Sequence, residues 1–316
     1  MKLDCPPIIS VIIPCYNAER TISRCLYSLL HQTFHQWEAI CIDDGSSDDT
    51  YHLLQAFSKK DSRIIAKQQH NKGVAITRLV GVKLARGKYV TFLDSDDSLE
   101  SHFLNSMLTL FNPDFDIVVS GFNLVLSQKK TKKIKYKSCT MGQLDYLKAI
   151  LTGAYGWELC GKLYRLSLFQ NPLYTSNLIR IGEDALHFIQ LITYSRNIRI
   201  AEITGYNYIQ SESSISKNKD TQLALETLKA ASAIDQILRR KDYYSEIRDE
   251  VNSMYLLFYS NSTRRAPIGW HVPAVLEVYE KHLTAKSLLK ISSLKAIYIL
   301  LSLSLAKFIS WLSRSS

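Results

Sequence analysis

The sequence predicts an α/β fold with a mostly parallel central sheet, because patterns of buried strands alternate with patterns of amphipathic helices over its first third. The run Ile8–Ile13 is apolar and β-branched and is ended by Pro14, which is typical of a strand buried on both faces. Ala18–Gln32 follows with apolar residues at helical spacing. The linkers are short, and this favours parallel strands joined by helices that cover both faces of the sheet.

The same alternation continues to about residue 93. In chain order we expect a strand at Glu38–Ile42, the turn Asp43–Thr50, a helix through Leu53, Leu54 and Phe57, a strand at Arg63–Lys67, the turn Asn71–Gly73, a helix through Ile76, Leu79, Val80 and Leu84, and a strand at Tyr89–Leu93.

Beyond Phe111 the pattern is looser, and from about Thr221 it is helical to the end, with breaks near Pro267–Gly269 and Pro273. Between these points we expect a strand at 117–126, a lysine-rich hairpin or loop at 128–137, helices at 140–152 and 183–194, and one or two strands within 198–209.

Composition and charge describe a globular protein, with 46% hydrophobic and 22% charged residues. The net charge of +10 is unevenly distributed. Residues 1–111 carry 12 basic and 12 acidic residues, whereas residues 112–316 carry 27 and 17. Because the first third has no excess of positive charge, we do not expect it to bind nucleic acid.

The six cysteines, at positions 5, 15, 25, 41, 139 and 160, form no CxxC pair. We expect reduced, mostly structural thiols, as in a cytoplasmic protein. The first seven residues contain no long apolar core, so no signal peptide is expected.

The tetrapeptide Asp94-Ser95-Asp96-Asp97 directly follows a strand pattern. Three carboxylates at such a position repel one another and resist burial unless a cation joins them. A divalent cation that carries a diphosphate supplies this charge, and hard oxygen ligands suit Mg²⁺ or Mn²⁺. The alternative is structural: Asp97 or Ser98 caps a helix that begins near Glu100.

Two other polar clusters, Pro14–Asn17 and Asp43–Ser47, also follow predicted strands. Ligands of open α/β sheets bind outside the carboxyl ends of the strands. The convergence of three clusters at these ends favours a ligand site over an isolated helix cap.

Taken in order, the motifs are Ser10–Asn17, Gln32-Thr33-Phe34, Asp43–Asp48, Asn71–Gly73, Arg78, Gly81, Gly87–Tyr89 and Phe92–Asp97. This order closely resembles the family-2 glycosyltransferases, which are inverting enzymes of the GT-A fold that use nucleotide sugars. The resemblance is nearly continuous over residues 8–111. Weaker matches lie at Cys160–Arg165, Gly182–Asp184 and Tyr206–Tyr208.

The resemblance implies a role for each cluster. Asp94, with Ser95, contacts the ribose or diphosphate of the nucleotide sugar, Asp96 binds a divalent metal (Mn²⁺ or Mg²⁺), and Asp97 is a cap or a supporting group. The nucleoside pocket is formed by Pro14, Tyr16, Asn17, Asp43 and Asp44.

For Asp44 and Arg78, the residue type gives a chemical reason for a binding role, and each also has a structural alternative. Asp44 can accept the imide N–H of uracil, or it can form a turn with Gly45 and Ser46. Arg78 can reach a diphosphate or the base, or it is a solvated helix arginine. The family usually carries Ala-Arg-Asn where this chain has Thr77-Arg78-Leu79, so contacts of the neighbouring residue do not carry over.

Inversion needs a base for the acceptor hydroxyl. Glu183-Asp184 resembles the acidic pair of the family, and we expect Asp184 to be the base with Glu183 in support; the alternative is a pair that only favours a helix N-terminus. His187 is expected to be structural. The family usually has a basic residue after Tyr208, whereas this chain has Gln210, with Lys217 further on, so closure over the diphosphate stays unassigned.

The segment from Lys281 to Ser316 has six basic residues and no acid. The uncharged stretch between Lys295 and Lys307 is eleven residues long, roughly 16 Å as a helix, about half of a bilayer core. We therefore expect a helix at the membrane interface, with Trp311 at the boundary, rather than a spanning helix. The alternative is a packed terminal helix or a dimer contact.

The expected protein is a metal-dependent glycosyltransferase of the GT-A fold that moves a sugar from a nucleotide donor, expected to be UDP-linked, to a glycan or glycolipid acceptor of lipopolysaccharide, capsule or a similar surface polysaccharide. The expected domains are 1–220, with a nucleotide-binding half at 1–111 and an acceptor half at 112–220, and a helical extension at 221–316. The expected place is the cytoplasm, at the inner leaflet of the membrane. The alternatives are a sugar-phosphate nucleotidyltransferase and an inactive nucleotide-sugar-binding or scaffold protein.

Overall fold

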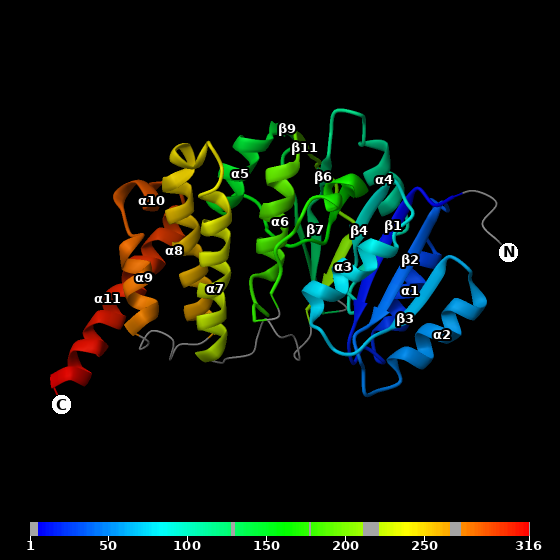
Figure 1. The fold of residues 1–316 in the computed structure, drawn as a ribbon, viewed down its shortest axis with the longest axis horizontal. Coiled ribbons are helices and arrows are strands. Elements are labelled where there is room, and N and C mark those ends of the chain that lie inside the picture. The colour runs from blue at the N-terminus through cyan, green and yellow to red at the C-terminus, as the bar shows by residue number, and fades with distance from the viewer. Residues whose placement is uncertain (1–5, 128–129, 177, 211–220, 266–272, 316) are drawn as a thin grey trace. The chain divides into compact units, whose positions relative to one another are not determined.

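The computed structural model describes residues 6–127, 130–176, 178–210, 221–265 and 273–315, and the chain divides into two compact units (Figure 1). Unit 1 comprises Met1–Gln143, Glu158–Asn177 and Leu191–Ser211, and unit 2 comprises Leu144–Trp157, Leu178–Gln190 and Glu212–Ser316. Two short segments from before residue 220 thus group with the C-terminal helices. The predicted domain boundary at 220–221 stays a prediction.

The large sheet of unit 1 has eight strands in the order β3-β2-β1-β4-β10-β6-β11-β9. The neighbours β3, β2, β1 and β4 are parallel, and β11 is parallel to β6, whereas β10 and β9 run antiparallel to their neighbours. The predicted mostly parallel α/β sheet is confirmed. The strands are β1 (Ile9–Cys15), β2 (Trp37–Asp43), β3 (Ile64–Gln68), β4 (Tyr89–Phe92), β6 (Ile117–Val119), β9 (Cys139–Gly142), β10 (Lys162–Arg165) and β11 (Asn197–Ile200).

The helices α1 (Ile22–Leu30), α2 (Thr50–Lys60), α3 (Val74–Leu84) and α4 (Phe103–Thr109) belong to unit 1. Helix α1 begins four residues later than the predicted start at Ala18. The backbone N–H of Ala18 instead donates to the hydroxyl of Thr50 at 2.7 Å, and that of Glu19 donates to Asp48 at 3.1 Å. These bonds join two loops at the carboxyl edge of the sheet.

A second sheet in unit 1 has the order β5-β12-β7-β8, with β5 (Ser98–Leu99), β7 (Phe122–Ser127), β8 (Lys130–Ile134) and β12 (Tyr206–Ile209). The single strand predicted at 117–126 is wrong, because it divides at Gly121 into β6 and β7, which lie in different sheets. The N–H of Gly121 donates to the carbonyl of Ile203, and a Cβ at this position would lie 2.0 Å from the carbonyl oxygen of Ile134. Only glycine lets the chain pass from one sheet to the other there.

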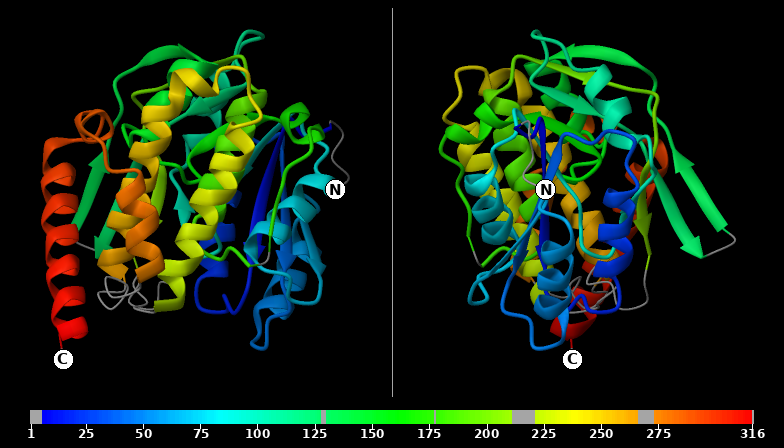
Figure 2. Two further views of the ribbon diagram at one scale, coloured as in Figure 1. Left: turned by 60° about the vertical axis from the view of Figure 1, so that its left-hand side comes forward. Right: turned by 90° about the vertical axis from the view of Figure 1, so that its right-hand side faces the viewer.

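Of the hairpin or loop predicted at 128–137, Lys130–Ile134 forms strand β8, which pairs with β7 before the segment; residues 128–129 lie outside the described residues. Figure 2 (right) shows β7 and β8 as two green arrows. The region 198–209 forms two strands, β11 and β12. The predicted helices at 140–152 and 183–194 are present as α5 (Gln143–Leu151) and α6 (Glu183–Tyr194). The core of unit 1 packs β1, β2 and β4 against α1 and α4, with Trp37, Phe103 and Tyr206 fully or almost fully buried.

From residue 221 the described residues of unit 2 are mainly helical, as predicted; the predicted break near Pro267–Gly269 lies outside the described residues, and Pro273 begins a helix. These helices are α7 (Thr221–Leu238), α8 (Arg248–Arg265), α9 (Pro273–Lys281), α10 (Ala285–Leu289) and α11 (Ser293–Ser315). Helices α7 and α8 lie side by side, and α11, red in Figures 1 and 2, packs on α8. The rings of Tyr259 and Tyr279 pack against each other in the core at a tilt of 56°, with ring centroids 4.8 Å apart. Within the described residues, no helix combines the length and the apolar character that crossing a membrane requires.

Candidate active site

Three predicted polar clusters meet at the carboxyl edge of β1, β2 and β4. Cys15 of β1 is in register with Asp43 of β2, and Ile12 of β1 is in register with Phe92 of β4. Because the strands are parallel, the residues after them leave the sheet on the same side. The Pro14–Asn17, Asp43–Ser47 and Asp94–Asp97 segments are therefore neighbours.

Asn17 joins the first of these segments to the second. It has a positive φ of 48°, its N–H donates to the hydroxyl of Ser46 at 2.9 Å, and its side-chain oxygen accepts the N–H of Ser47 at 2.9 Å. Asparagine tolerates this backbone conformation better than most residues. Beside it, Pro14 is buried and the ring of Tyr16 is 55% exposed, so an aromatic face is available at this edge.

Asp43 is an internal acceptor. It is fully buried and accepts hydrogen bonds from the hydroxyl of Ser46 and from the side-chain amide of Gln68 at 2.9 Å. The Asx-type turn of this loop thus belongs to Asp43 and not to Asp44. Direct contact of Asp43 with a nucleoside stays a prediction.

Asp44 ties β2 to the Asn71–Gly73 turn. It is only 4% exposed, and it accepts from Gln69 at 2.7 Å, from the N–H of Lys72 at 2.9 Å and from the N–H of Gly73 at 2.8 Å. A carboxylate has about four acceptor positions, so three internal donors leave room for one more, such as a base imide.

Gly45 makes this close approach possible. Its φ is +76°, and a Cβ there would lie 3.0 Å from the backbone nitrogen of Asn71. The loop after β2 therefore needs a glycine both for its backbone conformation and for the space beside the Asn71–Gly73 turn.

Arg78 of α3 points inward and forms an ion pair with Asp94, with 2.9 Å between Nη2 and Oδ1. It is 5% exposed, so the alternative of a solvated helix arginine is wrong. The guanidinium compensates one carboxylate of the acidic cluster. Its contact with a diphosphate or a base stays a prediction.

Asp97 does not cap a helix. It is 1% exposed, and it accepts the hydroxyl hydrogen of Tyr206 at 2.6 Å and the N–H of Ile209 at 2.8 Å. Helix α4 begins only at Phe103, after the short strand β5. The predicted cap is therefore wrong, and Asp97 supports the turn by binding it to β12. Burial, followed by the nearby charge of Asp94, raises the pKa of Asp97 to about 8.

Tyr206 is the centre of this support. Its hydroxyl donates to Asp97 and accepts the backbone N–H of Asp94 at 3.2 Å. One buried phenol thus holds both ends of the acidic turn. The sequence pattern placed Tyr206 in a family motif but indicated no role for it.

Asp96 differs from its neighbours. Its side chain is half-buried, and its pKa is raised by burial and by the charge of Asp94. Its backbone carbonyl accepts a hydrogen bond from Arg24 at 2.5 Å, whereas its carboxylate accepts none from another residue that the structure describes; the charge of Arg24 partly opposes the rise in its pKa. Ser95 beside it is half-buried as well. Nothing in the sequence pattern indicated the contact from Arg24.

These residues fit a divalent cation that has few protein ligands. Among the described residues, no cluster of three or more histidine, cysteine, aspartate or glutamate side chains is arranged to hold a metal ion. Mg²⁺ and similar ions commonly bind to one or two carboxylates, with water and substrate phosphates completing the coordination. Asp96 is suited to that arrangement, because its carboxylate accepts no hydrogen bond from another described residue and is compensated only in part by the charge of Arg24.

Glu183 and Asp184 lie in unit 2, where they begin α6, and both are half-buried. Gly182 before them has a φ of +87°, and a Cβ there would lie 2.7 Å from the Cβ of Ala230. The assignment of Asp184 as the base stays a prediction. His187 on the same helix is 2% exposed. Lys217, named above for the loop after Tyr208, lies outside the described residues.

Comparison with known proteins agrees with this geometry. The profile of glycosyl transferase family 2 matches residues 10–170, slightly more than half of the chain. The chain is 26% identical over 259 residues to the putative glycosyltransferase EpsH of Bacillus subtilis, covering 79% of this chain and 75% of that protein. Among curated proteins it also matches an uncharacterised glycosyltransferase of Rickettsia bellii, 32% identical over 202 residues, covering 60% of this chain and 27% of that longer protein.

Among solved structures, the fold matches residues 1–349 of Staphylococcus aureus TarS in complex with UDP, with a TM-score of 0.71 and 18% identity, covering 97% of this chain and 91% of that one. The parallel strands, the polar turns that meet at their carboxyl edge and the family profile over residues 10–170 lead to one conclusion: the chain belongs to glycosyl transferase family 2 and is a glycosyltransferase of the GT-A fold.

Proposed function

We propose that this glycosyltransferase uses a UDP-linked sugar as its donor and transfers the sugar, with inversion, to a hydroxyl group of a surface glycan such as lipopolysaccharide or capsule. The observation that carries the donor side is the acidic turn, in which Asp94 is compensated by Arg78 and Asp96 is left available. The TarS structures in complex with UDP and with UDP-GlcNAc support a uridine donor.

In the proposed site the exposed ring of Tyr16 stacks on the base, and Asp44 offers its remaining acceptor position to the imide N–H. Asp94 and Ser95 contact the ribose or diphosphate. Asp96 would hold Mn²⁺ or Mg²⁺, which neutralises charge on the departing diphosphate when it is bound. The complex of the Pyrobaculum calidifontis mannosyltransferase PcManGT with GDP-Man and Mn²⁺ supports such a cation.

The proposed base is Asp184. In the transfer, the acceptor oxygen forms a bond to the anomeric carbon, the bond from that carbon to the diphosphate oxygen breaks, and the hydroxyl proton moves to Asp184. The nucleoside diphosphate leaves with the electron pair. A positioned carboxylate typically contributes 10²–10⁴-fold to such a step.

The test is donor hydrolysis and acceptor transfer with a panel of nucleotide sugars in the presence of Mn²⁺ or Mg²⁺. Asp96→Ala should lower donor hydrolysis at least about 100-fold, and Asp184→Asn should lower transfer by a similar factor while the affinity for UDP is retained. Asp145→Asn is the matched control, because Asp145 is an exposed acid in the first turn of another helix, α5.

Retention of full transfer by Asp184→Asn would remove this residue as the base. If the wild-type protein neither binds UDP nor hydrolyses any donor, the proposed uridine donor is wrong.

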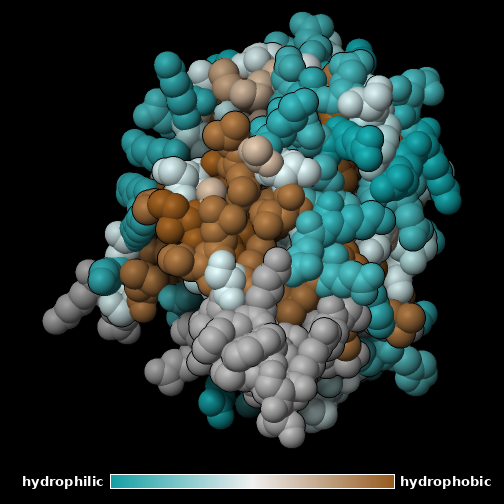
Figure 3. All heavy atoms as spheres, turned by 90° about the vertical axis from the view of Figure 1, so that its left-hand side faces the viewer, coloured by the Kyte–Doolittle hydropathy of each residue, from teal (hydrophilic) through white to brown (hydrophobic). Residues whose placement is uncertain are grey.

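We further propose that unit 2 binds the anionic cytoplasmic surface of the inner membrane, which would bring the enzyme to a lipid-linked acceptor. Helices α10 and α11 expose large apolar side chains, and Figure 3 shows an apolar surface on the side of the molecule where α11 lies. The exposed residues are Leu289, Leu294, Ile297, Leu300 and Leu301.

The charges beside this surface suit anionic lipid. Lys281 and Lys286 are exposed, and no acid follows Lys281 in the sequence; Lys290 is exposed as well but forms an ion pair with Glu250 at 2.6 Å. The five described cysteines are free thiols, as in a reducing compartment. The side chain of Trp311 lies outside the described part of the structure. Flotation with vesicles is the measurement that tests this proposal.

A further inference from the structure

A cationic groove lies at the end of the large sheet opposite to the acidic turn. It has a volume of about 470 Å³, and Lys88, Asp116, Arg165 and Arg196 are among its lining residues. Lys88 directly precedes β4, Asp116 precedes β6, and Arg196 precedes β11. Arg165 ends the antiparallel strand β10, where it is in register with Tyr89. The groove thus lies at the amino ends of β4 and β6, whereas the Asp94–Asp97 turn follows the carboxyl end of β4.

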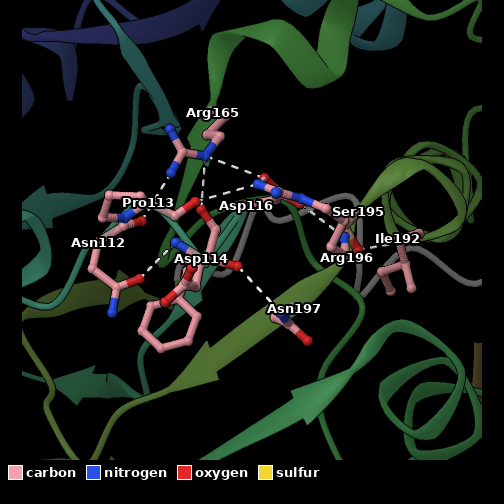
Figure 4. A network of polar contacts seen from close by, with 10 residues as sticks. Asn112, Pro113, Asp114, Asp116, Arg165, Ile192, Ser195, Arg196 and Asn197 are labelled. Carbon is pink, nitrogen blue, oxygen red and sulfur yellow. Dashed lines mark hydrogen bonds and ion pairs between the residues drawn. The ribbon is translucent and has the colours of Figure 1, made fainter.

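Asp116 fixes the two arginines (Figure 4). Its Oδ1 contacts Arg196 Nη2 at 3.0 Å and Arg165 Nε at 3.1 Å, and its Oδ2 accepts the backbone N–H and the Nε–H of Arg196 at 2.8 and 3.1 Å. Burial alone would raise the pKa of Asp116, but the bonds and charge of Arg196, with the charge of Arg165, outweigh it and lower that pKa. Asp116 is therefore a carboxylate at neutral pH, and its acceptor positions are filled.

Backbone carbonyls hold the arginines further. Arg165 Nε donates to the carbonyl of Phe115 at 2.8 Å, and its Nη2 donates to that of Asn112 at 2.8 Å. The Nη2 of Arg196 also reaches the carbonyl of Pro113 at 3.3 Å. Each guanidinium is thus fixed through Nε and Nη2, so little conformational freedom remains to be lost when a ligand binds.

These contacts leave several N–H donors of the groove without a hydrogen-bond partner among the described residues. No hydrogen bond within the described residues uses Nη1 of Arg165, Nη1 of Arg196 or Nζ of Lys88. Lys88 instead lies 5.5 Å from the centre of the Tyr89 ring. Ser167, on the wall formed by the 3₁₀ helix Leu166–Gln170, adds an exposed hydroxyl.

The charge balance of the groove is positive. Three cationic side chains face one carboxylate, and counting the exposed Asp114, whose charge acts on Arg196, still leaves an excess of one positive charge. A purely structural clamp would need only Asp116 and the two arginines. It would need neither Lys88 nor the remaining Nη1 groups.

We propose that this groove is a second ligand site, which binds a small soluble molecule carrying a phosphate or diphosphate group. Arginine forks and a lysine ammonium together suit such oxyanions, since the guanidinium groups donate from fixed positions and the ammonium supplies a mobile charge. The site is independent of the proposed donor site, because the two lie beyond opposite ends of β4.

The test is a titration of the full chain with pyrophosphate at low ionic strength and with EDTA present, so that no cation can bind the anion at the acidic turn. The Nε–H signals of Arg165 and Arg196 in ¹⁵N-labelled protein report binding at the groove. We expect both signals to shift in a saturable way. The double variant Lys88→Gln/Arg196→Gln should weaken binding roughly tenfold or more, and added salt should weaken it as well.

Arg199→Gln is the matched control. Arg199 lies on β11, three residues from Arg196, but contacts Ser138 and Thr140 and does not line the groove. The Arg199→Gln variant should bind pyrophosphate with the same affinity as the wild type. The proposal is overturned if pyrophosphate shifts neither arginine signal, or if the double variant, with an unchanged circular dichroism spectrum, binds as tightly as the wild type.

Discussion

At the scale of single residues, the acidic turn is organised by a division of roles among like charges. Asp94 is compensated by Arg78, Asp97 is buried under Tyr206, and Asp96 alone keeps a carboxylate that other described residues do not bind. Three neighbouring carboxylates would otherwise repel one another. The turn therefore concentrates its unsatisfied negative charge at one side chain, which is what a site for a divalent cation needs.

Removal of the Tyr206 hydroxyl tests this organisation. Tyr206→Phe leaves a buried Asp97 without one donor and releases the N–H of Asp94, so we expect a loss of about 1–3 kcal/mol in the free energy of unfolding and a higher KM for the donor. Tyr208→Phe on the same strand is the control, since Tyr208 packs on Phe122 through its ring. The support role fails if the two variants unfold alike and have the same KM.

The sequence pattern assigned distinct roles to Asp94 and Asp96 and offered two for Asp97, a helix cap or a supporting group, of which the cap is wrong. The reason is distance along the chain: the donors to Asp97 are Tyr206 and Ile209, more than a hundred residues away. A local pattern of acids before a helix cannot reveal a partner on a strand of another sheet. Arg24, which binds the carbonyl of Asp96, was missed for the same reason.

At the scale of elements, glycines decide where α6 starts and where the sheets divide. Gly182 sets the backbone before Glu183 and Asp184, and its missing side chain admits Ala230 and the ring of Phe258, whose Cε1 would be 3.0 Å from an added Cβ. The start of the helix that carries the proposed base is therefore fixed by packing inside unit 2 and by a positive φ.

Gly182→Ala should lower the free energy of unfolding by about 2–4 kcal/mol, because alanine combines a strained backbone with a steric clash. Gly142→Ala is the matched control, since nothing lies within 4 Å of its added Cβ. Thermal unfolding of both variants measures the difference. Equal melting temperatures would show that α6 can begin without a glycine.

The Asp116 cluster joins the starts of β6 and β11 to the end of β10, and its effect on stability should depend on pH. The lowered pKa of Asp116 means that its contribution is present above the pKa of the unfolded chain and is lost as the pH falls through the folded pKa. Asp116→Asn should therefore lower the free energy of unfolding by about 2–3 kcal/mol at pH 7. The loss should be smaller below about pH 4.

Denaturant unfolding at pH 7 and at about pH 2.5, well below the pKa of 3.8 of an unperturbed aspartate, measures this difference. Asp114→Asn is the control, because Asp114 is exposed and its hydrogen bonds are made by its backbone. A cost for Asp116→Asn that does not change with pH would mean that its carboxylate is not stabilised by the arginines.

At the scale of the whole molecule, the parts of the fold that depend on periodicity were predictable. The alternation of strands and helices over residues 8–93 predicted a parallel sheet, and parallel strands place the polar turns at one edge. Ser120-Gly121 interrupts the apolar residues of Ile117–Leu126, but the division into two sheets was not predicted, because the carbonyl that excludes a side chain at Gly121 comes from Ile134, outside that segment. The grouping of Leu144–Trp157 with the C-terminal helices has the same origin in long-range packing.

The excess of positive charge lies in residues 112–316, and this leads to a prediction for membrane binding. The full chain should float with vesicles that contain anionic lipid and not with neutral vesicles, because the apolar surface and the exposed lysines of unit 2 act together at an interface. Leu294→Ser/Leu301→Ser removes two side chains that are 81% and 66% exposed, and we expect roughly tenfold weaker binding. Lys281→Gln/Lys286→Gln should weaken binding to anionic vesicles roughly 30-fold, at about 1 kcal/mol per lysine.

The matched control is Leu84→Ser/Leu126→Ser, which replaces two exposed leucines of unit 1. If this control lowers flotation as much as Leu294→Ser/Leu301→Ser does, the effect is one of general hydrophobicity and α11 has no special part in it. If the full chain does not float even at low salt, the exposed leucines of α11 contact something other than lipid. Loss of binding only in the α11 and lysine variants would instead assign one helical surface to the membrane and leave the carboxyl edge of the sheet to the donor.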